Sequence, residues 1–178
     1  MNTVKNTKHF TSILFILSLL VIDQVSKWAT QAYLPHMSTV PYVYPYGGIP
    51  VFSNILGIEA SIAYATNKGA AWGMLSDFPL FLISIRIFLV LGMVGYLLYW
   101  NQNRSLFFPF LLVITGATGN IIDHFIYGYV VDMFNVVLWG YDYPVFNVAD
   151  ITIFCGVAWL IIYYLIYGDT EVKHDSSH

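Results

Sequence analysis

Residues 128–152 read "GYVVDMFNVVLWGYDYPVFNVADIT", a stretch that is mostly apolar and aromatic. Within it, Asp132 and Asp150 lie directly against hydrophobic segments. A carboxylate is costly in such surroundings unless it is paired with another group or used in a reaction. The stretch therefore predicts two hydrophobic segments joined by a short connection, with two acids placed where the segments meet it.

The composition of the whole chain indicates a membrane protein. Of its 178 residues, 58% are hydrophobic and only 10% are charged, against about 25% in an average soluble domain. The length suits a single integral membrane domain. The net charge of −3 gives no footprint for nucleic-acid binding. The one cysteine, Cys155, lies in an apolar run, which excludes an internal disulfide and a cysteine-based metal site.

Four segments are long and apolar enough to cross a bilayer, which needs about 20 residues. They predict an α-helical membrane protein with transmembrane helices at about residues 10–34, 79–100, 106–127 and 146–167. The polar tail, 168–178, is predicted to be disordered. The first span begins like a secretory signal. Apolar residues continue to Tyr33 without a small-residue cleavage site, so we expect it to be retained.

Lysine and arginine near the ends of the spans predict the orientation. Lys5, Lys8, Arg104 and Lys173 place both termini and the short loop before the third span on the cytoplasmic side, whereas the other connections carry only Lys68. Connections 35–78 and 128–145 are then expected outside, in the periplasm of a bacterium. Turn signals in 40–52 and the alternation of residue types in 58–67 predict a small β-structure in the first of them.

Counting along the predicted helices places the acids at a similar depth, in the outer third of the membrane. These are Asp23 in the first span, Asp123 in the third, Asp132 just beyond it and Asp150 at the start of the fourth. Asn120 and Asn147 fall at the same level. Polar groups from three helices at one depth indicate a site.

Several of these residues also have structural interpretations. Asp23 and Lys27 are four residues apart in the acid-first order that favours a helical ion pair, and we expect that pair to be structural. Asn120 and Asp123 share a helix face and could tie the third helix to its neighbours.

The later acids are harder to explain by structure alone. Asn147 and Asp150 could cap the fourth helix, but Asp132 has no cap or partner within its own segment. Arg86, about 10 Å inside the second span, is expected to have a structural role, either extending to the interface or pairing with an acid.

Two carboxylates close together can share one proton, because ionising both is unfavourable. The ionised member can take a proton from water, and the protonated member can protonate a carbonyl oxygen. This is amide hydrolysis without a metal or a covalent intermediate. The chain lacks the HExxH and GxSxG patterns and a cysteine–histidine arrangement, and its acids are less clustered than a hard-cation site requires.

Five boxes in order along residues 10–168 resemble lipoprotein signal peptidase, the type II signal peptidase of bacteria. They are "DQVSK" (23–27), "NKGAAWG" (67–73), "GATGNIIDH" (116–124), "VVDM" (130–133) and "FNVAD" (146–150). The family implies an aspartyl endopeptidase of the inner membrane that cuts the signal peptide from a prolipoprotein, before a cysteine carrying diacylglycerol.

The resemblance also implies the roles of individual residues. Asp132 and Asp150 would be the catalytic pair, supported by Asn67, Asn120, Asp123 and Asn147, with no metal or cofactor. The family fold is four transmembrane helices with a periplasmic β-cradle. Its partners are the lipid-modified prolipoproteins and the membrane lipids, and globomycin inhibits it as a non-cleavable mimic of the substrate.

Two further positions concern substrate contact. The family has an arginine after the aspartate of its third box, and this chain has His124, which would be a weaker and pH-dependent substitute. Gly69, Ala70 and Ala71 are predicted to be small because the chain or the substrate passes close to them.

Two other functions would also bury acids at one depth. One is a small acid-lined membrane carrier, and the other is a non-catalytic assembly factor in which the acids join helices. A carrier would need a polar path to the cytoplasmic side, but the inner halves of the four spans are almost wholly apolar.

Overall fold

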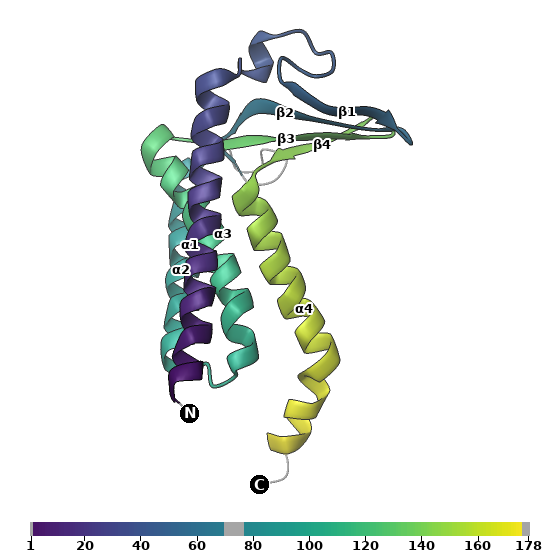
Figure 1. Ribbon diagram of the computed structural model, residues 1–178. Helices are drawn as coiled ribbons and strands as arrows, with labels where there is room; N and C mark the ends of the chain where they lie inside the picture. Colours follow the sequence, from purple (N-terminus) through teal and green to yellow (C-terminus); the bar gives the residue numbers. More distant parts are fainter. Residues whose placement is uncertain (1, 70–76, 176–178) are drawn as a thin grey trace.

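A computed structural model describes residues 2–69 and 77–175. Four long helices stand side by side and carry a small sheet at one end (Figure 1). In chain order the elements are α1 (Asn2–Tyr33), the short 3₁₀ helix η1 (Met37–Thr39), β1 (Ile49–Ile55), β2 (Ile58–Asn67), α2 (Pro79–Tyr99), α3 (Arg104–Tyr127), β3 (Val130–Leu138), β4 (Tyr141–Phe146) and α4 (Val148–Asp175). Ala70 and Ala71, predicted to be small for a close approach, and the rest of the "AAWG" part of the second box lie outside the described residues.

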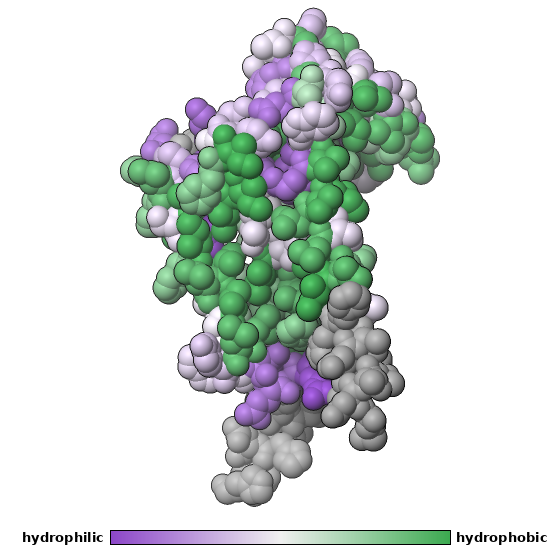
Figure 2. Space-filling view, turned by 60° about the vertical axis from the view of Figure 1, so that its left-hand side comes forward, coloured by the Kyte–Doolittle hydropathy of each residue, from purple (hydrophilic) through white to green (hydrophobic). Residues whose placement is uncertain are grey.

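Among the described residues, four helices are long and apolar enough to cross a membrane, with spans at Thr11–Tyr33, Pro79–Tyr99, Arg104–Tyr127 and Val148–Tyr167. Their outer surfaces expose large apolar side chains, such as Phe88 at 76% and Leu165 at 81%. Figure 2 shows hydrophobic side chains covering the helices, with hydrophilic ones gathered toward the two ends. Exposure of so large an apolar surface to water would be unfavourable, so the helices face lipid. The predicted class, a four-helix membrane protein with a small sheet, is confirmed.

The fourth span ends at Tyr167, as predicted, but the helix does not end there. Helix α4 continues to Asp175, so residues 168–175 are helical where the sequence predicted disorder. The limits of α3, by contrast, follow from ordinary capping. The side chain of Asn103 accepts a hydrogen bond from Ser105 N at its start. Gly128 adopts a left-handed conformation at its end, with φ of 78°, which glycine accommodates without strain.

The four strands form one antiparallel sheet in the order β1-β2-β3-β4. The first connection supplies β1 and β2, as its sequence predicted. The other half comes from the connection between α3 and α4, whose strands the residue pattern had not indicated. In the pairing of β2 with β3, Ala65 lies opposite Asp132 and Asn67 lies opposite Val130. This register brings Asn67, the last residue of β2, and Asp132, in β3, to the end of the sheet that lies against the helices (Figure 1).

Helices α3 and α4 pack closely because small residues lie between them. A Cβ added to Gly116 would come within 2.4 Å of the carbonyl oxygen of Ala149, and one added to Gly156 within 2.8 Å of the carbonyl oxygen of Pro109. Such contacts let two membrane helices approach at backbone distance. The packing fixes the start of α4, where Asp150 lies, against the outer half of α3.

Candidate active site

Asp132 is buried at the junction of sheet and helices, with only 3% of its surface exposed. Its carboxylate oxygen Oδ1 accepts a hydrogen bond of 2.7 Å from Asn147 Nδ2. The same amide group also donates to the carbonyl of Val131 at 3.2 Å. Asn147 therefore holds both the side chain of Asp132 and the strand that carries it.

Asn147 and Asp150 cap the start of α4 in a reciprocal arrangement. Asp150 N donates to Asn147 Oδ1 at 2.9 Å, and Asn147 N donates to Asp150 Oδ2 at 3.1 Å. This is the geometry of a capping box. The two residues therefore cap the helix, as their structural interpretation predicted, and the cap also fixes Asp150 relative to Asp132.

Asn120 connects the second aspartate to a buried lysine. Its amide nitrogen donates to Asp150 Oδ1 at 2.8 Å. Its amide oxygen accepts from Lys27 Nζ at 2.9 Å and from Asn147 Nδ2 at 3.2 Å. The side-chain amide nitrogen of each asparagine thus donates to one of the two carboxylates, and the two side chains also bond to each other.

Lys27 is completely buried, and its ammonium group has three acceptors for its three protons. Besides Asn120, it lies 2.9 Å from Asp23 Oδ2 and 2.8 Å from Asp123 Oδ2. Both carboxylates are themselves buried. A buried charge is tolerated when it is paired and fully hydrogen-bonded, which is the case here.

The two carboxylates around Lys27 also anchor the elements that carry the catalytic candidates. Asp23 Oδ1 accepts from Ala149 N at 2.8 Å, so helix α1 caps the first turn of α4. Asp123 Oδ2 accepts from Val131 N at 3.2 Å, next to Asp132 in β3. Gly119 permits this arrangement, because a Cβ there would come within 2.6 Å of Asp23 Oδ2.

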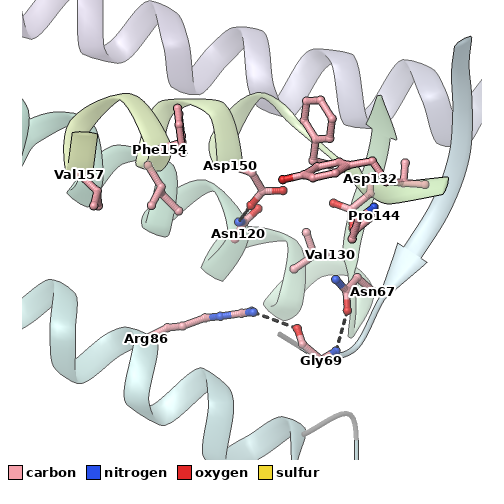
Figure 3. Close-up of a pocket in the computed structure, with 14 residues that line it drawn as sticks. Asn67, Gly69, Arg86, Asn120, Val130, Asp132, Pro144, Asp150, Phe154 and Val157 are labelled. Carbon is pink, nitrogen blue, oxygen red and sulfur yellow. Dashed lines mark hydrogen bonds between the residues drawn. The ribbon is translucent and has the colours of Figure 1, made fainter. Parts of the chain in front are cut away.

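A cavity of about 410 Å³ opens in front of the two aspartates. Figure 3 shows Asp132, Asp150 and Asn120 on one side of it, and Arg86 of α2 on another. Most of its remaining wall is apolar and comes from β4 and the membrane-embedded part of α4; this part includes Tyr143, Pro144, Val145, Phe146, Ile153, Phe154 and Val157. A polar end with two acids therefore continues into an apolar end.

The acids differ in their surroundings. Burial and the negative charge of Asp150 raise the pKa of Asp132 from 3.8 to about 7, against the opposing effect of hydrogen bonds from Asn147 and Asn67. Asp150 is only half-buried, and each of its oxygens accepts an N–H hydrogen bond. Such bonds favour an ionised carboxylate. The raised pKa makes Asp132 the candidate to hold a shared proton near neutral pH.

Comparison with known proteins identifies the family. The sequence model described as "Signal peptidase (SPase) II" matches residues 15–166. The chain belongs to the signal peptidase II family.

Individual relatives agree over nearly the whole chain. The lipoprotein signal peptidase of Staphylococcus aureus is 34% identical over 171 residues, which is 94% of this chain and 96% of that protein. The one from Chlamydia felis (strain Fe/C-56) is 32% identical over 168 residues, 92% and 95% of the two chains.

Solved structures share the fold. One described as "Bacterial membrane enzyme structure by the in meso method at 2.3 A resolution" superposes with a TM-score of 0.73 at 31% identity, over 90% of each chain. A second, at 1.9 A resolution, gives a TM-score of 0.69 at 32% identity, over 87% of this chain and 92% of the other. The family's aspartic peptidase chemistry fits the two acids beside the cavity, and it argues against a carrier or a non-catalytic assembly factor.

In this signal peptidase II chain, most of the sequence-predicted residues meet at one place. Asp132, Asp150, Asn67, Gly69 and Asn120 line the cavity. Asn147 lies behind the pair, and Asp23, Lys27 and Asp123 form the layer behind the asparagines. Among the described residues, no group of three or more metal-binding side chains occurs.

Arg86 lines the cavity, whereas His124 does not. His124 is half-buried in the last turn of α3 and does not line the cavity, so its contact with substrate stays a prediction. Arg86 does line it. Within the described part of the chain it forms no ion pair with an acid, and it donates instead to the carbonyl of Gly69 at 3.1 Å. An arginine within an apolar span is unusual, and that could have marked Arg86 as part of the site. The sequence analysis predicts only a structural role for it.

Proposed function

We propose that this protein removes signal peptides from prolipoproteins whose cysteine carries diacylglycerol, with Asp132 and Asp150 as the catalytic pair. The observation that carries the proposal is the contact of Asn147 with both acids, through its side chain to Asp132 and through its main chain to Asp150. Because one residue holds both carboxylates beside one cavity, the two acids are positioned to act on the same substrate. Membership of the signal peptidase II family supplies the reaction class.

The surroundings of the two acids suggest separate roles. The ionised Asp150 takes a proton from a water molecule while the water oxygen attacks the scissile carbonyl carbon. Asp132, which holds the shared proton, gives it to the carbonyl oxygen. In the tetrahedral intermediate, Asp150 then passes its proton to the leaving nitrogen as the C–N bond breaks. The proton on the carbonyl oxygen returns to Asp132, which restores the pair.

The apolar end of the cavity supports a lipid-modified substrate. A second hollow of about 390 Å³ adjoins the first and shares Tyr143, Phe146, Asp150 and Phe154 with it. The rest of its wall is apolar, from Val136, Leu138 and Ile151. Acyl chains or apolar signal-peptide residues would fit such walls, and both would reach the acids without leaving the bilayer.

Charge distribution supports a periplasmic site in a bacterial inner membrane. The start of α1, the loop before α3 and the end of α4 lie at the end of the helices away from the sheet (Figure 1). The sequence there carries Lys5, Lys8, Arg104 and Lys173, and cytoplasmic loops are enriched in such residues. Both termini would then be cytoplasmic, and the sheet and the acids would face the periplasm.

The test is cleavage by the purified protein in lipid or detergent, with EDTA present. Two synthetic prolipoprotein peptides are compared, one with a diacylglyceryl cysteine and one with an unmodified cysteine. We expect cleavage before the modified cysteine only, and inhibition by globomycin, which would occupy the cavity as a substrate mimic. Absence of cleavage by a folded sample, or full activity in the Asp150→Asn variant, would overturn the proposal.

A further inference from the structure

Among the described residues that line the cavity, Arg86 is the one with a permanent positive charge. It lies about two turns inside the span of α2, where an arginine needs partners for its five N–H donors. Its one hydrogen bond to a described residue goes to the carbonyl of Gly69, just past the end of β2. The guanidinium group therefore uses one donor on a backbone carbonyl, and its side chain lines the cavity.

The position of Arg86 relative to the acids is equally informative. Neither Asp132 nor Asp150 lies within 4.0 Å of the guanidinium group, although the charges of both act on it. In Figure 3 the arginine reaches from α2 toward Gly69, with Asp150 and Asn120 on the other side of the open space. An extended peptide that enters between them would meet the carboxylates on one side and the guanidinium group on the other.

Resting on the proposed function, we propose that Arg86 is a substrate-binding residue that holds carbonyl oxygens of the lipopeptide beside the scissile bond. The fork of an arginine suits this task, because it can keep its bond to Gly69 and still donate to a second oxygen. The oxygens can come from two sources, the peptide backbone or the ester groups of the diacylglyceryl unit. Both are uncharged acceptors, and both would lie near the reacting bond.

A purely structural role predicts something different. If Arg86 only tethered Gly69 to α2, its removal would lower activity equally for every substrate. Direct contact predicts instead that removal of the arginine and weakening of one substrate carbonyl have non-additive effects. The two roles can therefore be separated by a cycle of enzyme variants and substrate analogues.

The experiment measures kcat/KM for the wild type and for Arg86→Met on three kinds of lipopeptide. The first is the normal diacylglyceryl peptide. The second is a set with one backbone carbonyl near the cut, other than the scissile one, replaced by a thioamide. The third carries ether-linked alkyl chains in place of the esters. The variant Arg104→Met is the matched control, because Arg104 is exposed and lies at the other end of the helices.

We expect one substitution in the peptide or the lipid to lower wild-type kcat/KM by about threefold to tenfold, the effect of weakening one charge-assisted hydrogen bond. The same substitution should have no effect on Arg86→Met, while Arg104→Met should behave as the wild type. A thioamide that meets this condition marks a backbone carbonyl as the ligand, and the ether analogue marks an ester. Equal effects of every analogue on wild type and Arg86→Met would overturn the inference.

If Arg86→Met fails to fold, judged by thermal unfolding, Arg86→Gln takes its place in the cycle. A glutamine stays polar but removes the charge and is shorter, so the same loss of sensitivity to one analogue is expected. Unchanged sensitivity in Arg86→Gln would overturn the inference. Failure of the wild type to cleave the normal lipopeptide would count against the proposed function itself, and is seen before any analogue is used.

Discussion

Lys27 Nζ lies 2.9 Å from Oδ1 of Asn120, and this contact determines which end of the Asn120 amide faces Asp150. An ammonium group has only donors, so it contacts the amide oxygen and leaves the amide nitrogen to donate to Asp150 at 2.8 Å. Lys27 thus acts on the proposed catalytic pair without touching it. The ion pair that sequence spacing suggested is part of a layer that orients the site.

Lys27→Met should destabilise the protein by about 3–5 kcal/mol, the usual effect of removing one partner from a buried ion pair. The reason is that Asp23 and Asp123 would stay buried without their cation. Thermal unfolding in detergent measures this, with Lys68→Met as the control, because Lys68 is exposed. An unfolding temperature of Lys27→Met equal to that of Lys68→Met would contradict the buried network.

Asp132→Asn and Asp150→Asn should each lower kcat by at least about 10²–10⁴-fold, as expected when a general acid or base is lost. The amide keeps the shape of the carboxylate but cannot exchange the shared proton. Both variants should fold normally, and binding of the uncleaved lipopeptide should persist. Near-normal turnover in either variant would exclude that residue from the pair.

The pH dependence of cleavage should show a decline above about pH 7. The pKa of Asp132 is raised to about 7, mainly by burial and then by the charge of Asp150, so higher pH removes the proton that Asp132 must donate. The hydrogen bond from Asn67 lowers this pKa, and Asn67→Ala should therefore move the decline to higher pH. A pH–rate series for both proteins checks the shift. A decline that moves to lower pH in Asn67→Ala would contradict the assignment.

The same carboxyl group should make stability depend on pH. Its pKa in the folded protein lies above the unfolded value of 3.8, so the folded state binds the proton more tightly. This contribution is complete below about pH 4 and is lost as the pH rises through about 7. Asp132→Asn should remove that part of the pH dependence, and unfolding temperatures at pH 5 and pH 8 would show it. An unchanged difference between the two pH values would rule out Asp132 as its source.

The helices could be predicted from the sequence because each apolar run is long enough to determine its own structure. The sheet could be predicted only in part. The alternation in 58–67 predicts β2. Residues 130–138 carry large apolar side chains on both faces, and Val130, Val131 and Met133 are all buried. Apolar and polar residue types therefore do not alternate along this segment, and its pattern does not predict β3.

The site, like the sheet, could be predicted from the sequence only in part. The depth of the acids in the membrane can be counted along the chain, and the counting brought Asp132, Asp150 and Asn120 to one level. The choice of partners depends on how helices rotate and pack, which spacing alone does not determine. The ion pair of Asp23 with Lys27 can therefore be predicted from the sequence. Its hydrogen bond with Ala149 N, 126 residues away, cannot. For the same reason, the sequence predicts only a structural role for Arg86. Spacing alone does not show that α2 turns this side chain toward the cavity.

Substitutions at Gly116, Gly119 and Gly92 test how closely the helices must approach to build the site. A Cβ at Gly116 would come within 2.4 Å of the backbone oxygen of Ala149, which cannot move without shifting the start of α4. One at Gly119 would come within 2.6 Å of Asp23 Oδ2 and displace the cap on Ala149 N. Around Gly92, in the exposed middle of α2, nothing lies within 4 Å.

Gly116→Ala and Gly119→Ala should each destabilise the protein by about 1–3 kcal/mol, the usual effect of overpacking. Both should also lower kcat, because the first turn of α4 carries Asp150. Gly92→Ala should leave unfolding temperature and cleavage close to wild type, since the same atom is added where there is room. If Gly116→Ala behaved like Gly92→Ala in both measurements, close contact between α3 and the start of α4 would not be what positions Asp150.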